Sequence, residues 1–217
     1  MNKLELKSIS YRYPRAKRMI LKDVCVSFEP GKLYSVEGES GAGKSTLLTI
    51  LAGLSRPVSG EILADGEPIR NRTEYRRNTA AAVAQDNLLF DGRTILENVM
   101  YPLLLKGVAP DEAEERAYAY LAEVKLDREL GGHFPRECSG GEQKRAAFAR
   151  AMALENPVFL ADEPTANLDK GTAAVIADLL ENIAHDKGRL VIAVTHDDVI
   201  PARADKRFFL RAGVLEE

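Results

Sequence analysis

Gly38-Glu39-Ser40-Gly41-Ala42-Gly43-Lys44-Ser45 is the stretch that decides the fold class of this chain. It matches the phosphate-loop pattern G-x-x-x-x-G-K-[ST], and Thr46 follows it. We expect a strand at residues 33–37 before it and a helix at residues 44–52 after it, which is the setting that such a loop requires. Glycines let backbone N–H groups curl around an anion, and the start of the helix adds its positive dipole end. The stretch therefore predicts a site for a nucleoside triphosphate.

Two side chains of the loop carry chemistry of their own. Lys44 would neutralise the β and γ phosphate oxygens as a point charge. The Ser45 hydroxyl is placed to bind Mg²⁺. The motif alone predicts triphosphate binding and leaves the reaction open.

The chain around the loop alternates between apolar runs and helical patterns. The apolar runs 158–161 and 190–195 are separated by a helical pattern, which indicates a buried parallel sheet. Before the loop, alternating residues predict antiparallel strands at residues 4–9 and 24–28. Short strands are expected at 61–64, within a hairpin, and at 79–84, and longer helices at 94–106, 111–125, 139–154 and 171–185.

These elements predict one α/β domain over residues 1–217. Its core would be that of a P-loop NTPase with a mostly parallel sheet, preceded by an N-terminal antiparallel β subdomain. An α-helical subdomain is inserted at roughly residues 86–153. No internal repeat or low-complexity tract interrupts the chain.

Composition excludes several classes of protein. The 217 residues are 45% hydrophobic and 29% charged, which excludes disorder and collagen-like order. A net charge of −3 lacks the basic excess of a protein that coats nucleic acid. We expect neither secretion nor membrane insertion of the chain by itself, and we expect Cys25 and Cys138 to be reduced thiols. The basic cluster of Arg70, Arg72, Arg76 and Arg77 is interpreted as a solvated face.

Polar residues follow the apolar strands where parallel strands present their carboxyl ends. Asp162 and Glu163 end the first apolar run, and His196 ends the second. Asp162 could hold Mg²⁺, and Glu163 could polarise an attacking water as a general base. Gln85 follows the short strand at 79–84. Taken alone, Gln85 is more simply explained as an ordinary loop amide, and His196 as a helix cap or a surface residue.

A second glycine-rich stretch opens the helix at 139–154. It is Cys138-Ser139-Gly140-Gly141-Glu142-Gln143, and its small residues at a helix N-terminus suit a second contact with an anion. A flexible helix cap is the structural alternative.

Together these motifs resemble those of the nucleotide-binding subunit of an ATP-binding cassette (ABC) transporter, over nearly the whole chain. Residues 38–46 resemble the Walker A loop, Asp162-Glu163 the Walker B end, and 138–143 the signature. Asn167-Leu168-Asp169 resembles the D-loop. Gln85 and His196 stand where the family has its Q-loop glutamine and its switch histidine.

The resemblance implies a Mg²⁺-dependent ATPase with four catalytic residues, Lys44, Gln85, Glu163 and His196. The metal would be held by Ser45, Gln85 and Asp162. Tyr13 would stack on adenine, although Tyr11 lies two residues away. The remaining nucleotide contacts would come from Gly38, Glu39, Ser40, Gly41, Ala42, Gly43, Lys44, Ser45, Thr46, Ser139, Gly140, Gly141, Glu142 and Asp169.

The signature departs from the family's common LSGGQ at two positions. Cys138 stands for Leu and keeps an apolar packing role open. Glu142 stands for Gln, and its carboxylate can still accept from ribose hydroxyls. The residues at 163–169 and the SGGEQ form are closest in style to the branch that serves lipoprotein release, macrolide export and cell division.

The resemblance also implies partners and a location. One phosphate loop and one signature predict two cassettes, expected as a homodimer, around two ATP molecules. A separate integral-membrane permease is expected to hold the subunit at the cytoplasmic face of the membrane, with no nucleic acid bound. The apolar residues that follow Gln85 would mostly be core, with a minority exposed as the docking groove: Leu88, Leu89, Phe90, Val99, Tyr101 and Leu103 to Leu105.

Two alternatives remain at this point. A non-transport ABC ATPase acting on nucleic acid or ribosomes would normally carry a long coiled coil or two cassettes, and neither fits 217 residues. A phosphate-loop kinase or switch protein would share residues 38–45 but has no use for Ser139 to Gly141.

Overall fold

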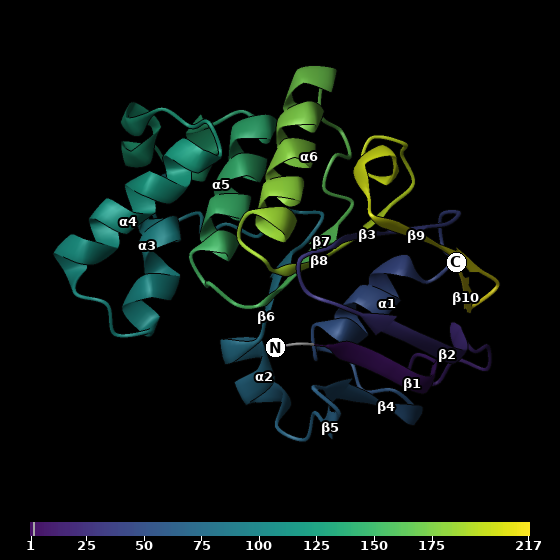
Figure 1. The fold of residues 1–217 in the computed structure, drawn as a ribbon. Helices are drawn as coiled ribbons and strands as arrows, with labels where there is room; N and C mark the ends of the chain where they lie inside the picture. The colour runs from purple at the N-terminus through teal and green to yellow at the C-terminus, as the bar shows by residue number, and fades with distance from the viewer. Residues whose placement is uncertain (2) are drawn as a thin grey trace.

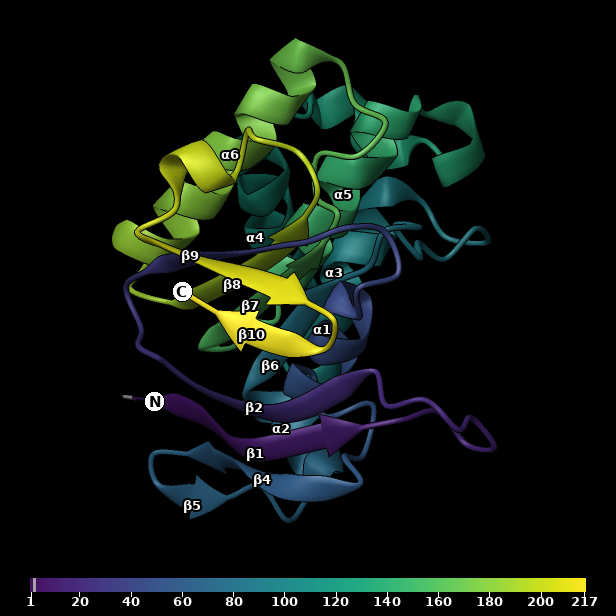
Figure 2. The same ribbon diagram turned by 90° about the vertical axis from the view of Figure 1, so that its right-hand side faces the viewer.

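The computed structural model describes residue 1 and residues 3–217, and it is built in layers (Figures 1 and 2). A six-stranded sheet in the order β10-β9-β3-β8-β7-β6 lies in the middle of the molecule. A four-stranded antiparallel sheet, β2-β1-β4-β5, lies on one side of it, and the larger helices gather on the other. This arrangement confirms the predicted α/β P-loop NTPase class.

The central sheet is parallel from β9 to β6. Its strands are β3 (Leu33–Glu37), β6 (Ala80–Val83), β7 (Val158–Asp162), β8 (Leu190–Thr195), β9 (Lys206–Arg211) and β10 (Val214–Glu216). Leu33 pairs with Val191, and Val158 with Leu190, so the loop ends of β3, β8 and β7 lie at one edge. Only β10 runs antiparallel, against β9. Residues that follow neighbouring parallel strands lie close together in space. Here the phosphate loop follows β3, His196 follows β8, and Glu163 follows β7.

The antiparallel sheet consists of β1 (Leu4–Tyr11), β2 (Leu21–Phe28), β4 (Ser59–Ala64) and β5 (Glu67–Pro68). Strand β1 pairs with both β2 and β4. In β1, Leu4 and Leu6 are buried and Glu5 between them is half-buried, as expected for a sheet with one face on the core. The loop between β1 and β2 carries Tyr13 toward the phosphate loop.

Six α-helices complete the described part of the chain. They are α1 (Lys44–Leu51), α2 (Arg72–Asn78), α3 (Ile95–Leu105), α4 (Pro110–Glu123), α5 (Gly140–Met152) and α6 (Lys170–His185). Short 3₁₀ turns occur at Arg128–Gly132, Pro135–Glu137 and Pro201–Arg203. Helices α3 and α4 pack beside α5 and away from the antiparallel sheet (Figure 1). No helix among the described residues is long and apolar enough to cross a membrane.

The central strands bury both faces, which explains why their sequences are continuously apolar. Phe159 and Val191 belong to the core shared with α3 to α6, whereas Leu160 and Ile192 belong to the core shared with α1 and the antiparallel sheet. Alternate residues of one strand therefore enter different cores, as a period of two requires. The phosphate loop lies between these two cores.

The expected elements all occur, with ends that shift by a few residues. Helix α1 ends at Leu51 with Ala52 as its cap, and α5 begins after Ser139. The sequence analysis missed α2 because it is short and polar, with only Tyr75 buried. It also missed β9 and β10 because Lys206-Arg207 and the exposed Val214 at this edge disguise the alternation.

Candidate nucleotide-binding site

The phosphate loop connects β3 to α1 and depends on glycines for its shape. Gly41 and Gly43 have φ angles of 78° and 106°, in the region that L side chains avoid. A Cβ atom at Gly38 would approach the Leu210 carbonyl oxygen to 2.6 Å, and one at Gly43 would approach Ile20 to 2.8 Å. The fold therefore holds this loop tightly against its neighbours, with the N-terminus of α1 open to an anion.

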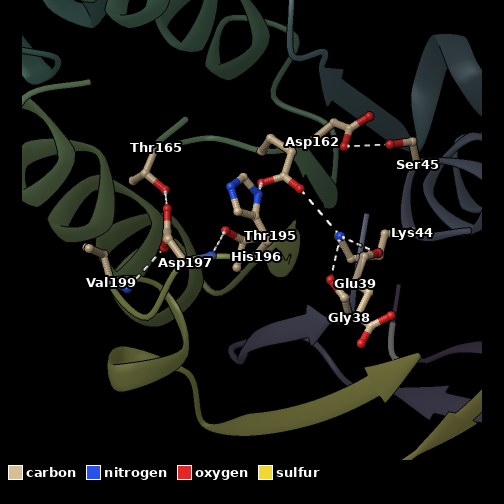
Figure 3. A network of polar contacts seen from close by, with 11 residues as sticks. Gly38, Glu39, Lys44, Ser45, Asp162, Thr165, Thr195, His196, Asp197 and Val199 are labelled. Atoms are coloured by element: carbon tan, nitrogen blue, oxygen red, sulfur yellow. Dashed lines mark hydrogen bonds and ion pairs between the residues drawn. The ribbon is translucent and has the colours of Figure 1, made fainter. Parts of the chain in front are cut away.

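Lys44 is buried, and its ammonium group lies inside the curve of the loop (Figure 3). Its Nζ donates to the carbonyl oxygens of Gly38 at 2.8 Å and Glu39 at 3.3 Å. It also lies 3.6 Å from Oε1 of Glu163. The ammonium group thus lies between the backbone carbonyls of the phosphate loop and the carboxylate of Glu163.

Ser45 and Asp162 come together although 117 residues separate them. The Ser45 hydroxyl donates to Oδ1 of Asp162 at 3.0 Å. Burial raises the pKa of Asp162, although the Ser45 hydrogen bond opposes this shift. A hydroxyl beside a carboxylate is a pair of oxygen ligands that fits Mg²⁺.

Glu163 links the lysine of the loop to the histidine that follows β8 (Figure 3). Its Oε2 lies 2.8 Å from Nδ1 of His196, while its backbone N–H donates to the Val194 carbonyl at 2.9 Å. Glu163 is 8% exposed and has a φ of 45°, a left-handed conformation that is uncommon for glutamate. The His196 side chain is 63% exposed, so this histidine faces the open side of the site.

Lys44, Ser45, Glu163 and His196 line one cavity of about 450 Å³, and Asp162 adjoins it through Ser45. The cavity wall also contains Tyr13, Thr46 and Gln85. The Tyr13 hydroxyl lies 2.8 Å from the Thr46 hydroxyl, and Tyr13 is 49% exposed. Tyr11 is 7% exposed and packs edge-on against Tyr13. Of the two tyrosines, only Tyr13 presents a ring that a base could stack on.

The signature residues are not in the wall of this cavity. Ser139 caps α5 by accepting from Glu142 N–H at 3.3 Å, and its own N–H and hydroxyl donate to Glu142 Oε2 at 2.7 and 2.8 Å. These hydrogen bonds lower the pKa of Glu142. Asp169 similarly caps α6 by accepting from Thr172, next to Gly141. Residues 139–142 and Asp169 therefore form a second exposed cluster.

A larger cavity of about 850 Å³ adjoins the first and shares Ser40, Gly41 and His196 with it. Its wall includes Ile20, His196 and the hairpin residues 209–213, in addition to residues 37–42 of the loop. The sequence analysis did not single out Ile20 or this hairpin, because nothing local marks residues that meet the loop only after folding. It also missed Thr165 and Asp197, whose side chains hydrogen-bond behind Glu163 and His196.

A phosphate loop between β3 and α1, with carboxylates at the ends of neighbouring parallel strands, defines a P-loop NTPase. Comparison with known proteins makes the class narrower. Residues 21–166 match the model of the family described as ABC transporter. The chain belongs to this family, and it is an ATP-binding and ATP-hydrolysing subunit of the ABC type.

Two bacterial relatives illustrate the similarity. The lipoprotein-releasing system ATP-binding protein LolD of Treponema denticola is 40% identical over 206 residues, covering 93% of this chain and 91% of LolD. The uncharacterized ABC transporter ATP-binding protein YbbA of Escherichia coli strain K12 is 41% identical over 203 residues, covering 91% of this chain and 89% of YbbA.

Solved structures agree with this assignment. The dimeric cassette MJ0796 matches with a TM-score of 0.92 and 33% identity, over 99% of this chain and 97% of that one. The same values hold for its dimeric post-hydrolysis state bound to ADP and Pi. CbiO1 of Clostridium perfringens, part of the ABC transporter complex cbiONQ, matches with a TM-score of 0.88 and 29% identity, over 99% of this chain and 86% of that one.

Proposed function

We propose that two copies of this chain close around two ATP molecules, each copy offering its phosphate loop to one nucleotide and its signature to the other. The observation that carries this proposal is the separation of the two clusters. Tyr13, Lys44 and Ser45 line the cavity, whereas Ser139 to Glu142 lie outside its wall, exposed or half-buried. A second copy would supply the missing wall and exclude water from the phosphates.

Each cavity residue then has a distinct task. The loop's N–H groups and Lys44 bind the phosphate oxygens, and Tyr13 stacks on the base. Glu163 takes a proton from the attacking water, because its carboxylate is buried and already held by Lys44 and His196. His196 orients that carboxylate and contacts the γ-phosphate, and Gln85 positions the water.

Ser45, Asp162 and Gln85 are the residues that we assign to Mg²⁺. When bound, the ion neutralises charge that develops on the phosphate oxygens. Ser45 and Asp162 are already within hydrogen-bonding distance, so little movement of these side chains is needed. From the partner copy, the Ser139 hydroxyl and the N-terminus of α5 meet the γ-phosphate, Glu142 accepts from the ribose, and Asp169 completes the contact.

The transport partner would be an integral-membrane permease that holds the pair at the cytoplasmic face of the membrane. Four exposed apolar residues in the segment that follows Gln85 support a docking surface: Leu88, Phe90, Leu104 and Leu105. Half of the eight apolar residues considered after Gln85 are therefore exposed, rather than the minority that we expected. Leu88 lies on the loop before α3, and Leu104 and Leu105 lie on the exposed face of α3. Similarity to LolD makes a lipid-modified protein the first substrate to test.

The proposal is tested by Glu163→Gln. Loss of a general base slows catalysis by about a hundredfold or more. We expect ATP hydrolysis to fall by that factor and an ATP-bound dimer to accumulate, measured by phosphate release and analytical ultracentrifugation. Glu61→Gln, an exposed change on β4, should leave both unchanged. Hydrolysis by Glu163→Gln at the wild-type rate would remove Glu163 from the role of base.

A further inference from the structure

Lys144 is a buried charge for which the proposed mechanism has no use. It lies on α5, directly after the signature, and is 3% exposed. Its ammonium group has no ion pair among the described residues within 4.0 Å, yet burying an isolated ammonium is costly unless its donors are satisfied. The position of Lys144 therefore calls for an explanation.

Its partners are main-chain carbonyls of the loop that follows β6. Nζ donates to the Gln85 carbonyl oxygen at 3.0 Å and lies 3.4 Å from that of Ala84. Desolvation lowers the pKa of Lys144, while the carboxylates of Asp162, Asp86 and Glu163 act to raise it. The ammonium group of Lys144 thus interacts electrostatically with carboxylates of the phosphate site and donates a hydrogen bond to the backbone of Gln85.

The rest of this loop is held from the helical side as well. Arg150, also on α5, donates to the carbonyl oxygens of Leu88 at 2.8 Å and Asn87 at 3.3 Å. Asn98 on α3 accepts from Phe90 N–H at 2.8 Å. The loop is therefore attached to α5 and α3 by hydrogen bonds.

We propose that Lys144 is a positioning residue that sets Gln85 in the phosphate site by holding its main-chain carbonyl. Lys144 touches neither nucleotide nor metal, and it acts through Gln85. Because it lies in the same helix as the signature, any movement of that helix toward a partner's ATP carries Gln85 with it. This inference rests on the proposed role of Gln85 at Mg²⁺.

The test measures the Mg²⁺ concentration that gives half-maximal ATP hydrolysis by the purified chain. Removing a group that orients a metal ligand typically costs 10- to 100-fold in metal affinity. We expect Lys144→Met to raise this concentration about tenfold, since it keeps the apolar stem and removes the donor. ATP binding measured without Mg²⁺ should stay within about twofold of wild type, which a merely unfolded or loosened protein would not achieve.

Arg150→Met is the matched control, because it removes a cation of the same helix that holds the same loop without touching Gln85. It should leave the Mg²⁺ requirement within about twofold of wild type. An equal rise in both variants would overturn the specific role of Lys144. If Lys144→Met does not fold, Lys144→Gln replaces it. The shorter glutamine side chain does not bring its donor to the carbonyl oxygens, so this variant should also raise the Mg²⁺ requirement.

Gln85→Ala separates failure of this inference from failure of the proposed function. If Gln85→Ala leaves the Mg²⁺ requirement unchanged, the assignment of Gln85 to the metal is wrong, and the inference falls with it. If Gln85→Ala raises the requirement and Lys144→Met does not, only the positioning role is overturned. When both raise it, the double variant should resemble Gln85→Ala alone, because residues that act through one another are not additive. Additive effects would contradict the inference.

Discussion

Glu163 shows how much the site depends on a single residue. Its carboxylate contacts both Lys44 and His196, and the backbone that carries it is in a strained left-handed conformation. Such strain costs of order 1–3 kcal/mol and persists only where neighbouring contacts enforce it. Here the hydrogen bond to Val194 and the buried ion pair with Lys44 supply that enforcement. These contacts hold Glu163 in the geometry that its proposed role as general base requires.

Tyr13 gives a prediction at this same scale. Base–aromatic stacking contributes about 1–3 kcal/mol, so Tyr13→Ala should weaken ATP binding about tenfold or more. Tyr13→Phe keeps the ring and loses only the contact with Thr46, and it should bind ATP within about threefold of wild type. Isothermal titration calorimetry distinguishes the two. Unchanged affinity in Tyr13→Ala would exclude stacking by this residue.

In the described part of the chain, the four helices α2, α3, α5 and α6 begin at a residue whose side chain caps the helix. Thr94 accepts from Glu97 N–H at 3.2 Å at the start of α3, and Glu97 Oε2 accepts from Thr94 N–H at 2.7 Å. Ser139 and Glu142 repeat this capping box on α5. In the signature, then, the glutamate that replaces the common glutamine also stabilises the helix end, because a carboxylate suits the positive dipole of a helix N-terminus.

Thr94→Ala tests the capping of α3. Loss of an N-cap side chain costs about 1 kcal/mol, which lowers Tm by about 2–4 °C in a protein of this size. Thr94→Ser keeps a hydroxyl at the same position and should retain most of the stability. Urea denaturation of the two variants and the wild type measures the difference. A midpoint for Thr94→Ala equal to that of wild type would show that the cap contributes nothing.

Three features to which we assign functions lie in different parts of the molecule. The phosphate site lies at the loop edge of the central sheet, the signature at the N-terminus of α5, and the exposed apolar residues on the loop after Gln85 and on α3. Helix α5 connects all three, because it carries the signature and holds the loop through Lys144 and Arg150. In the proposed assembly, α5 would therefore connect a permease docked at these apolar residues to the nucleotide.

Leu88→Glu tests that docking surface. A charge at this position should abolish co-purification of the permease from membranes. ATP hydrolysis by the isolated subunit should stay within about twofold of wild type, because Leu88 is already solvated and surface substitutions usually have small effects. Val214→Glu on β10, at the opposite edge of the sheet from β6, is the control and should retain the permease. Retention of the permease by Leu88→Glu would place its docking surface elsewhere.

Local sequence was sufficient for most elements of the fold. The phosphate loop, the apolar strands and the capped helices each depend on residues close in the chain, so their periodicity and turn residues identify them. Of the elements that escaped prediction, α2 and β10 are short and β10 forms an edge of the sheet, while β9 beside it has only two buried residues. Their place depends on neighbours that are distant in sequence, such as β3 beside β9.

The candidate site divides in the same way. Residue types and spacing were enough to select Lys44, Asp162, Glu163 and His196. The contacts between these residues follow only from the strand order β3-β8-β7-β6 and from the packing of α5 near β6. They are the contacts of Ser45 with Asp162, of Glu163 with His196, and of Lys144 with the backbone of Gln85. Strand order is set by long crossover connections and by burial on both faces of the sheet, and neither leaves a signal in a short window of sequence.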